Sequence, residues 1–110
     1  MLMDGLWTVE FGSNRGISGG GVAVLRDGTI WGGDSTHYYV GEYTLNGNIF
    51  NAQLRTSAFL HGAQSVFGTV GRDVTIDLQG SLTQNDQAIA QGQPRGLPGV
   101  TFAAKLTKRK

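Results

Sequence analysis

The sequence predicts an all-β protein, an antiparallel eight-stranded up-and-down barrel formed by a single domain that spans residues 1–110. Three observations lead to this prediction. Apolar and polar residues alternate with a period of two in several segments, as in strands with one buried face. Two-residue turn signals separate these segments, as in successive hairpins. Glycine accounts for 18 of the 110 residues, more than twice its usual share of about 7%, which disfavours helices and favours turns and bulges.

The first predicted strand spans Asp4 to Phe11, where Trp7, Val9 and Phe11 share one face and polar residues occupy the other. This alternation is the pattern of a strand that covers a core. Its three apolar residues are therefore candidates for the barrel interior.

The second and third predicted strands lie within Gly19 to Ile30, a segment that Asp27-Gly28 divides. This dipeptide is a strong signal for a two-residue hairpin turn. We expect Val22, Val24 and Ile30 to continue the apolar face on its two sides.

A central hairpin is predicted to join His37 to Leu45 with Asn48 to Ser57 through the dipeptide Asn46-Gly47. The second of these strands alternates clearly, which specifies its register. Its expected inward residues are Phe50, Ala52, Leu54 and Thr56.

Three more strands are predicted in the last third of the chain, over Asp73 to Thr83, Asp86 to Gln93 and Gly99 to Lys108. Asn85-Asp86 forms the turn between the first two, and a loop that contains Pro94 and Pro98 precedes the last. The alternating apolar residues of the first and last of these strands are Val74, Ile76, Leu78, Leu82, Val100, Phe102, Ala104 and Leu106.

The segment from Ser57 to Arg72 is the one connection too long for a hairpin. It either forms a short helical turn or crosses an open end of the barrel. Hairpin follows hairpin elsewhere, and closing the sheet into a barrel removes its exposed edges. We expect the interior of this barrel to contain Trp7, Val9, Phe11, Val74, Ile76, Leu78 and Phe102.

Charge and composition argue against several classes of protein. Nine basic and eight acidic residues give a formal charge of +1, too small for a surface that tracks nucleic acid or an anionic membrane. The longest uncharged stretch, Ser57 to Gly71, is interrupted by polar residues and glycine and is shorter than the roughly 20 apolar residues of a membrane helix. The chain has no cysteine and its start lacks the pattern of a secretion signal, so we expect a soluble cytoplasmic protein.

The motifs associated with catalysis are weak. Residues 16–20 match the pattern G-x-S-x-G, but no helix is predicted after them and neither histidine has an evident partner acid. A glycine-rich turn is the better interpretation. We predict no enzyme activity and no cofactor, because the candidate acids, bases and nucleophiles form no plausible set.

Metal and phosphate sites are not predicted either. His37 and His61, even with Asp34 or Glu42, lack the spacing of a zinc site, so we expect one histidine at a strand end and one in a loop. The sequence Gly32-Gly33-Asp34 predicts a tight turn in which Asp34 accepts hydrogen bonds from local backbone amides.

Aromatic residues gather in the central hairpin, at Tyr38, Tyr39, Tyr43 and Phe50. No basic residues interleave with them, so a protein or dimer contact is favoured over nucleic-acid stacking. The basic C-terminal sequence KLTKRK is interpreted as a solubilising tail.

Several segments resemble the GrlR family, small β-barrel proteins named for a negative regulator of type III secretion genes in enteric pathogens. The resemblance rests on the opening DGLWTVEF and GSN, the glycine-rich second strand, the GGD turn before a tyrosine-rich strand that contains Gly41, the SVFG block at Ser65 to Gly68, and the closing LPGVTFAAKLTK. It covers most of the chain, and the first half is the more distinctive.

The resemblance implies a lipocalin-like barrel, often dimeric and without catalytic activity, whose named member restrains transcription by binding an activator protein. That regulator carries an acidic Glu-Asp-Glu-Asp motif near the turn at Leu45 to Ile49. In this chain the turn reads Leu45-Asn46-Gly47-Asn48-Ile49 and contains no acid.

Two functions from different classes remain open. The first, which we prefer on the sequence alone, is a protein-interaction module that forms a homodimer or restrains a partner such as a transcriptional activator. The second is a carrier or sensor of a small apolar ligand, because an eight-stranded barrel can enclose one. Small inward residues (Gly80, Ala52, Ala88 or Ala90, Ala104) favour a cavity, whereas Trp7, Phe11 and Phe102 are large enough to fill it.

Overall fold

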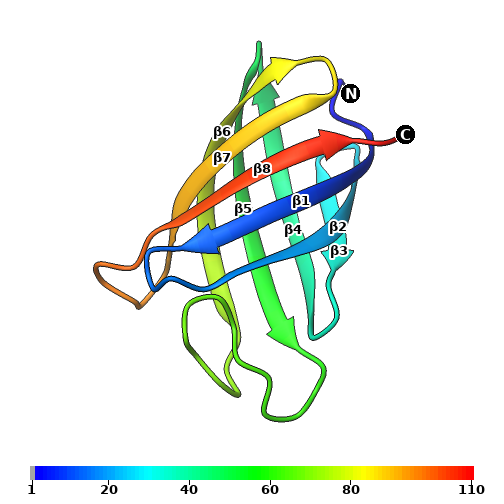
Figure 1. The fold of residues 1–110 in the computed structure, drawn as a ribbon. Helices are drawn as coiled ribbons and strands as arrows, with labels where there is room; N and C mark the ends of the chain where they lie inside the picture. Colours follow the sequence, from blue (N-terminus) through cyan, green and yellow to red (C-terminus); the bar gives the residue numbers. More distant parts are fainter. Residues whose placement is uncertain (1) are drawn as a thin grey trace.

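The computed structural model describes residues 2–110, which form a closed antiparallel barrel of eight strands (Figure 1). Each strand pairs with its neighbours in the sequence, and pairing of the first strand with the last closes the barrel. The predicted eight-stranded up-and-down barrel is confirmed. Its strands are β1 (Gly5–Ser13), β2 (Ser18–Arg26), β3 (Thr29–Gly33), β4 (His37–Asn46), β5 (Ile49–Ala58), β6 (Val74–Gln84), β7 (Gln87–Pro94) and β8 (Phe102–Lys108).

The short turns agree with the turn signals in the sequence, with one shift. Asp27 and Gly28 both have positive φ (50° and 82°) between β2 and β3, as a type I′ turn requires. The turn between β4 and β5 consists of Gly47 and Asn48, because Asn46 still pairs with Ile49. Only Gly47 of this turn has a positive φ, 65°, which is the pattern of a type II′ turn. The two-residue turn therefore begins one residue later than predicted.

The inward face of β2 differs from the prediction. Trp7 lies opposite Ala23 in the β1–β2 ladder, and residues opposite each other share a face of the sheet. Ala23 is therefore inside the barrel, whereas Val22 and Val24 are outside and exposed. Both alternating sets of β2 are apolar, so the period of two could not distinguish its inner face; Ile30 of β3 is buried as expected.

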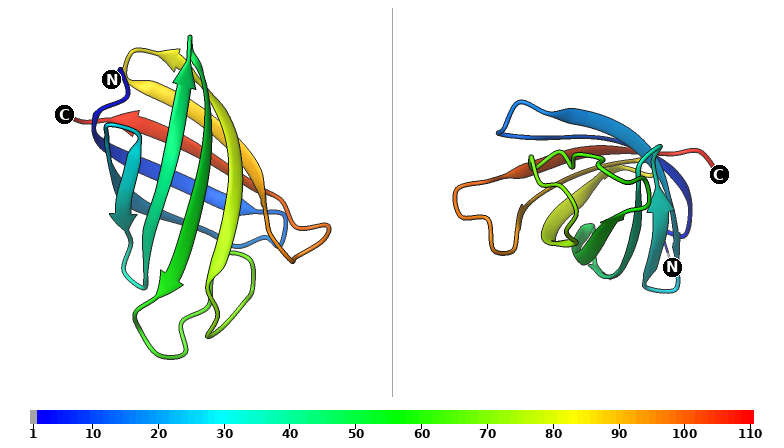
Figure 2. Two further views of the ribbon diagram at one scale, coloured as in Figure 1. Left: turned by 180° about the vertical axis from the view of Figure 1, so that it is seen from behind. Right: turned by 90° about the horizontal axis from the view of Figure 1, so that it is seen from below.

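Residues 59–73 contain no helix and lie across one end of the barrel, which decides between the two alternatives for this connection (Figure 2). A bridge between Gln64 and Val70 folds its middle into a small hairpin, which we call the cap. Phe67 at the turn of the cap is buried. Ser13, at the end of β1, anchors the cap by donating a hydrogen bond to the Val66 carbonyl oxygen.

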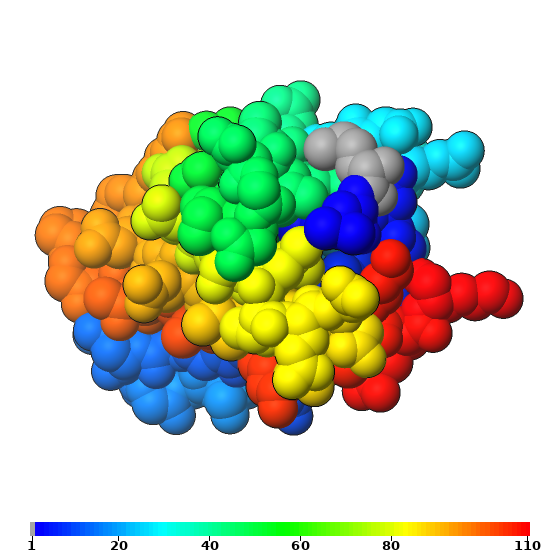
Figure 3. Space-filling view, turned by 90° about the horizontal axis from the view of Figure 1, so that it is seen from above, coloured from blue at the N-terminus to red at the C-terminus, as the bar shows by residue number. Residues whose placement is uncertain are grey.

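The opposite end of the barrel is filled by side chains, and we call it the closed end. Met3 and Trp7 are completely buried there, and Trp7 Nε1 donates a hydrogen bond to the Met3 carbonyl oxygen at 2.9 Å. Figure 3 shows this end from outside, where the turns after β4 and β6 and the segment before β1 lie together. No helix long and apolar enough to span a membrane occurs in residues 2–110.

Candidate functional site

An internal cavity of about 230 Å³ lies inside the barrel, between the closed end and the cap. Apolar cavities of about 150 Å³ are large enough to bind benzene, so this one has room for a somewhat larger molecule. Its wall consists mainly of apolar side chains from all parts of the barrel. The expected interior residues that line it are Val9, Phe11, Ile76, Leu78 and Phe102.

The other two residues expected inside, Trp7 and Val74, are also buried but do not line the cavity. Trp7 belongs to the apolar cluster of the closed end, and Val74 to the one beneath the cap. The cavity itself is lined by large aromatic side chains and by small ones. The small residues in its lining include Ala23, Ala52, Ala90 and Ala104.

The expectation of a protein contact at four aromatic residues needs correction. Tyr39, Tyr43 and Phe50 are inside the barrel and line the cavity, and only Tyr38 is outside, with 42% of its surface exposed. Successive residues of a strand point to opposite faces, so neighbouring Tyr38 and Tyr39 cannot share one surface.

Four aromatic rings follow one another from the cap to the polar end of the cavity. The ring centroid of Phe67 is 5.8 Å from that of Phe102, which stacks on Phe11 at 5.9 Å. Phe11 in turn meets Tyr39 edge-on at 6.3 Å. These separations are typical of favourable aromatic pairs, and three of the four rings come from different strands.

The hydroxyl of Tyr39 ends this series by donating a hydrogen bond to Asp34 Oδ2. Asp34 lies in the turn between β3 and β4, where its Oδ1 accepts bonds from the backbone amides of Thr36 (2.9 Å) and His37 (2.8 Å) and from the Thr36 hydroxyl (3.2 Å). The predicted turn, with Asp34 bound to local amides, is confirmed. Burial alone would raise the pKa of Asp34, but the bonds from Tyr39, Thr36 and His37 outweigh it and lower the pKa.

Burial and the bond to the Asp34 carboxylate together raise the pKa of Tyr39 far above its usual value. The tyrosine therefore remains a neutral donor to Asp34. The two groups form a stable pair of a hydroxyl and a carboxylate at the rim of an apolar space.

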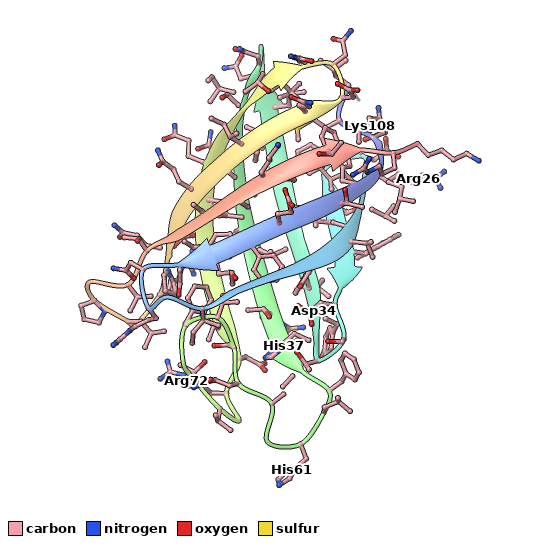
Figure 4. All side chains as sticks on the ribbon, viewed as in Figure 1. Arg26, Asp34, His37, His61, Arg72 and Lys108 are labelled. Carbon is pink, nitrogen blue, oxygen red and sulfur yellow. The ribbon has the colours of Figure 1, made fainter. Side chains whose placement is uncertain are left out.

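Two further polar side chains face the cavity beside this pair. His37 begins β4, as expected of a strand-end histidine, and its Nδ1 lies 2.7 Å from the Thr36 hydroxyl. Thr56 is opposite Tyr39 in the β4–β5 ladder. Within residues 2–110 neither His37 Nε2 nor Thr56 Oγ1 has a hydrogen-bond partner, and both residues line the cavity. Figure 4 shows Asp34 and His37 close together at the polar end of the cavity, whereas His61 lies at the tip of the connection formed by residues 59–73 and points away from them.

Gly21 in β2 makes room for the Tyr39–Asp34 pair. A Cβ atom at this position would lie 2.9 Å from the Tyr39 hydroxyl oxygen, 3.3 Å from Asp34 Cβ and 2.7 Å from the Gly33 carbonyl oxygen. The glycine-rich second strand thus leaves space for polar groups at the rim of the cavity. Sequence patterns did not reveal the roles of Gly21, Thr56 or Phe67, because these residues reach the cavity only after the barrel closes.

An exposed apolar row crosses the outside of the barrel. Val24, Trp31 and Val40 lie directly opposite one another on β2, β3 and β4, and 56% of the Trp31 surface is exposed. We call this set, with Leu6, Val22 and Tyr38 beside it, the outer apolar row.

Across the described chain, residues 2–110, no group of three or more His, Asp or Glu side chains is arranged to hold a metal ion. A scan against protein-family models found no match, and a search of curated proteins found no similar sequence. The fold and cavity define a small β-barrel with an apolar interior and one polar end.

Proposed function

We propose that this protein is a non-enzymatic binding protein, a carrier or sensor that holds one small, largely apolar molecule inside its barrel. The observation that carries the proposal is the cavity of about 230 Å³ with aromatic walls and a polar end. Small-molecule sites in proteins are typically concave and apolar, with a few converging polar groups that orient the ligand. A molecule of about ten non-hydrogen atoms matches this space, judged by the cavities that accept benzene.

The test is direct binding of 3-phenylpropan-1-ol, a ten-heavy-atom probe with an apolar body and a neutral polar head, followed by backbone amide shifts in NMR. We expect saturable shifts that concentrate on strand residues around the cavity. Native mass spectrometry of freshly purified protein provides the complementary search for a ligand carried over from cells.

A matched pair of variants locates the binding. Ala104 lines the cavity and Ala103 is its exposed neighbour on β8. Ala104→Leu should weaken binding of the probe at least about tenfold by filling the space, since about 1.4 kcal/mol is a factor of ten, whereas Ala103→Leu should leave it unchanged. Equal effects of the two variants, or no saturable binding together with no co-purifying mass, would overturn the proposal.

The outer apolar row favours a second role, the protein-interaction function that the family resemblance implies. Exposed apolar patches on small proteins mark contact surfaces, and a patch on one side of a barrel suits a two-fold homodimer. We propose that a second copy of this chain covers the row, and that a dimer of this kind would be the form that engages a partner such as a transcriptional activator.

Sedimentation velocity tests this second role. The wild type should sediment as a dimer, and Trp31→Glu should convert it to a monomer, because a carboxylate in the middle of the row would lose its water on association. Ile89→Glu is the matched control, since Ile89 is similarly exposed but lies on β7, outside the row. A wild type that stays monomeric at every concentration, or a dimer that Trp31→Glu leaves intact, would remove this role.

A further inference from the structure

The residues that line the cavity include an acidic side chain but no Lys or Arg. Asp34 is the single Asp or Glu among them. In the part of the chain that the structure describes, Arg95 forms an ion pair with Asp77, whereas Asp34 forms none. In Figure 4, Arg26 and Lys108 lie near the closed end, and Arg72 lies at the same end as Asp34 but is not among the residues that line the cavity. The polar end therefore carries a carboxylate with no Lys or Arg beside it in the cavity wall.

The hydrogen bonds of Asp34 leave one of its oxygens available. Oδ1 accepts three bonds, from Thr36 N, Thr36 Oγ1 and His37 N, while Oδ2 accepts only the bond from Tyr39. A carboxylate oxygen has two acceptor positions, so Oδ2 can take a second donor. The lowered pKa of Asp34 keeps this group ionised at neutral pH.

His37 and Thr56 line the cavity on the strands beside this carboxylate. The Thr36 hydroxyl has one hydrogen, and because Asp34 Oδ1 can only accept, that hydrogen is directed to it. The same hydroxyl oxygen must then accept from Nδ1–H of His37, 2.7 Å away. The other ring nitrogen, Nε2, has no partner within residues 2–110. Thr56 Oγ1 adds a further acceptor on the facing strand.

The walls around these acceptors also favour a positive charge. Phe11, Phe67, Phe102 and Tyr39 surround the approach to the polar end, and aromatic faces attract organic cations. An anionic head at the same place would be buried without a cation and close to Asp34, which is strongly unfavourable.

We infer that the barrel selects an organic ammonium ligand, with the ammonium group at Asp34 and Thr56 and a small apolar body in the cavity. This inference rests on the proposed binding function and adds the chemical class of the ligand. A fatty acid or another carboxylate should bind poorly, because no Lys or Arg side chain lines the cavity to pair with its charge.

Three probes with one apolar body and different heads test the inference by isothermal calorimetry or NMR at neutral pH: 3-phenylpropan-1-amine, 3-phenylpropan-1-ol and 3-phenylpropanoate. We expect the amine to bind about ten- to a hundredfold more tightly than the alcohol, the range expected of a charge-assisted hydrogen bond. The carboxylate should bind most weakly. Binding of the alcohol tests the proposed function, whereas the order of the three heads tests the inference.

Asp34→Asn supplies the sharper test, because it removes the charge and keeps the side-chain shape. It should abolish the preference for the amine over the alcohol, so that the two affinities differ by less than about twofold in the variant, well under the tenfold that 1.4 kcal/mol represents. Asp86→Asn, at an exposed turn between β6 and β7, is the matched control and should retain the preference.

The wild-type series decides the question even if Asp34→Asn does not fold. Equal affinity for the amine and the alcohol, or tightest binding of the carboxylate, overturns the inference without affecting the proposed binding function. A preference for the amine that survives in folded Asp34→Asn would overturn it as well.

Discussion

The two ends of the barrel place the same pair of side chains in different surroundings. At the closed end, Tyr43 donates a hydrogen bond to Asp4 Oδ1 at 3.0 Å, and at the cavity end Tyr39 donates to Asp34. Both tyrosines point inward from β4, four residues apart. The closed end is filled by large side chains such as Trp7, whereas the cavity end has space beside its carboxylate.

We assign different roles to the two tyrosine–carboxylate pairs. The pair at the closed end stabilises the fold, and we propose the pair at the cavity end as part of the binding site. Asp4 lies in the segment before β1, where it also accepts the Asp27 amide at 3.1 Å and so joins that segment to the β2–β3 turn. Asp34 instead organises its own turn and faces the cavity. A tyrosine–carboxylate bond thus completes the packing at one end, and at the other it holds a charged group at the rim of an apolar space.

The largest difference between the ends should appear on removing a tryptophan. Trp7→Ala should lower the free energy of unfolding by about 3–5 kcal/mol, because it leaves a large void in a filled core. Ile89→Ala is the control on the outside of the barrel, away from the outer apolar row, and should cost less than about 1 kcal/mol. Urea unfolding followed by circular dichroism measures both; similar losses would contradict the description of the closed end.

Gly21→Ala tests the space at the cavity end. The added Cβ would press on the Tyr39 hydroxyl and the Gly33 carbonyl, so we expect a loss of about 1–3 kcal/mol in urea unfolding, as for overpacked sites. Gly20→Ala is the control, because its Cβ would meet only the Val9 carbonyl oxygen, at 3.4 Å. If Gly21→Ala were as stable as Gly20→Ala, Gly21 would not be needed to accommodate the pair.

Asp34 should contribute to the pH dependence of stability. Burial opposes ionisation, but the bonds from Tyr39, Thr36 and His37 lower its pKa below the ordinary value of 3.8. Its contribution is therefore fully present above about pH 4 and is lost as the pH falls through the lower, folded-state pKa. Solvent screening keeps the effect below about 1 kcal/mol.

Urea unfolding between pH 6 and pH 2 measures this contribution as the difference between the wild type and Asp34→Asn. The difference should shrink as the pH falls. A difference that stays constant through the acid range would show that the Asp34 carboxylate is not stabilised by folding.

The smallest expected effect is a change in the titration of Tyr43 at the closed end, which is measured by ultraviolet absorbance. Burial, followed by the hydrogen bond to Asp4 and the charge of Asp4, raises the pKa of Tyr43 to about 12. Ultraviolet titration should detect its ionisation near that pH in the wild type, and earlier in Asp4→Asn, which lacks the charge. Since the folded state favours the neutral phenol, stability should fall as the pH rises from about 10 towards 12. An unchanged titration in Asp4→Asn would contradict the role of Asp4.

Much of the barrel could be predicted because strand patterns are local. The first, fifth, sixth and eighth strands alternate apolar and polar residues, and their predicted inward faces agree with the structure. The prediction was wrong for β2, where Val22 and Ala23 are both apolar, so only pairing with Trp7 determines which one faces inward. The aromatic residues of β4 were misplaced for a related reason, since Tyr38 and Tyr39 are equally suited to either face.

By itself the sequence determined the eight strands, most of the turns and the Asp34 turn, because each depends on residues within about ten positions of one another. Tertiary structure alone decided where the interior is empty. The cavity is the difference between the volume that eight strands enclose and the volume of side chains contributed by all of them, so no single segment encodes it. The same holds for its polar end, where Gly21 of β2 and Thr56 of β5 come to lie beside the Tyr39–Asp34 pair only when the strands take their places in the closed barrel.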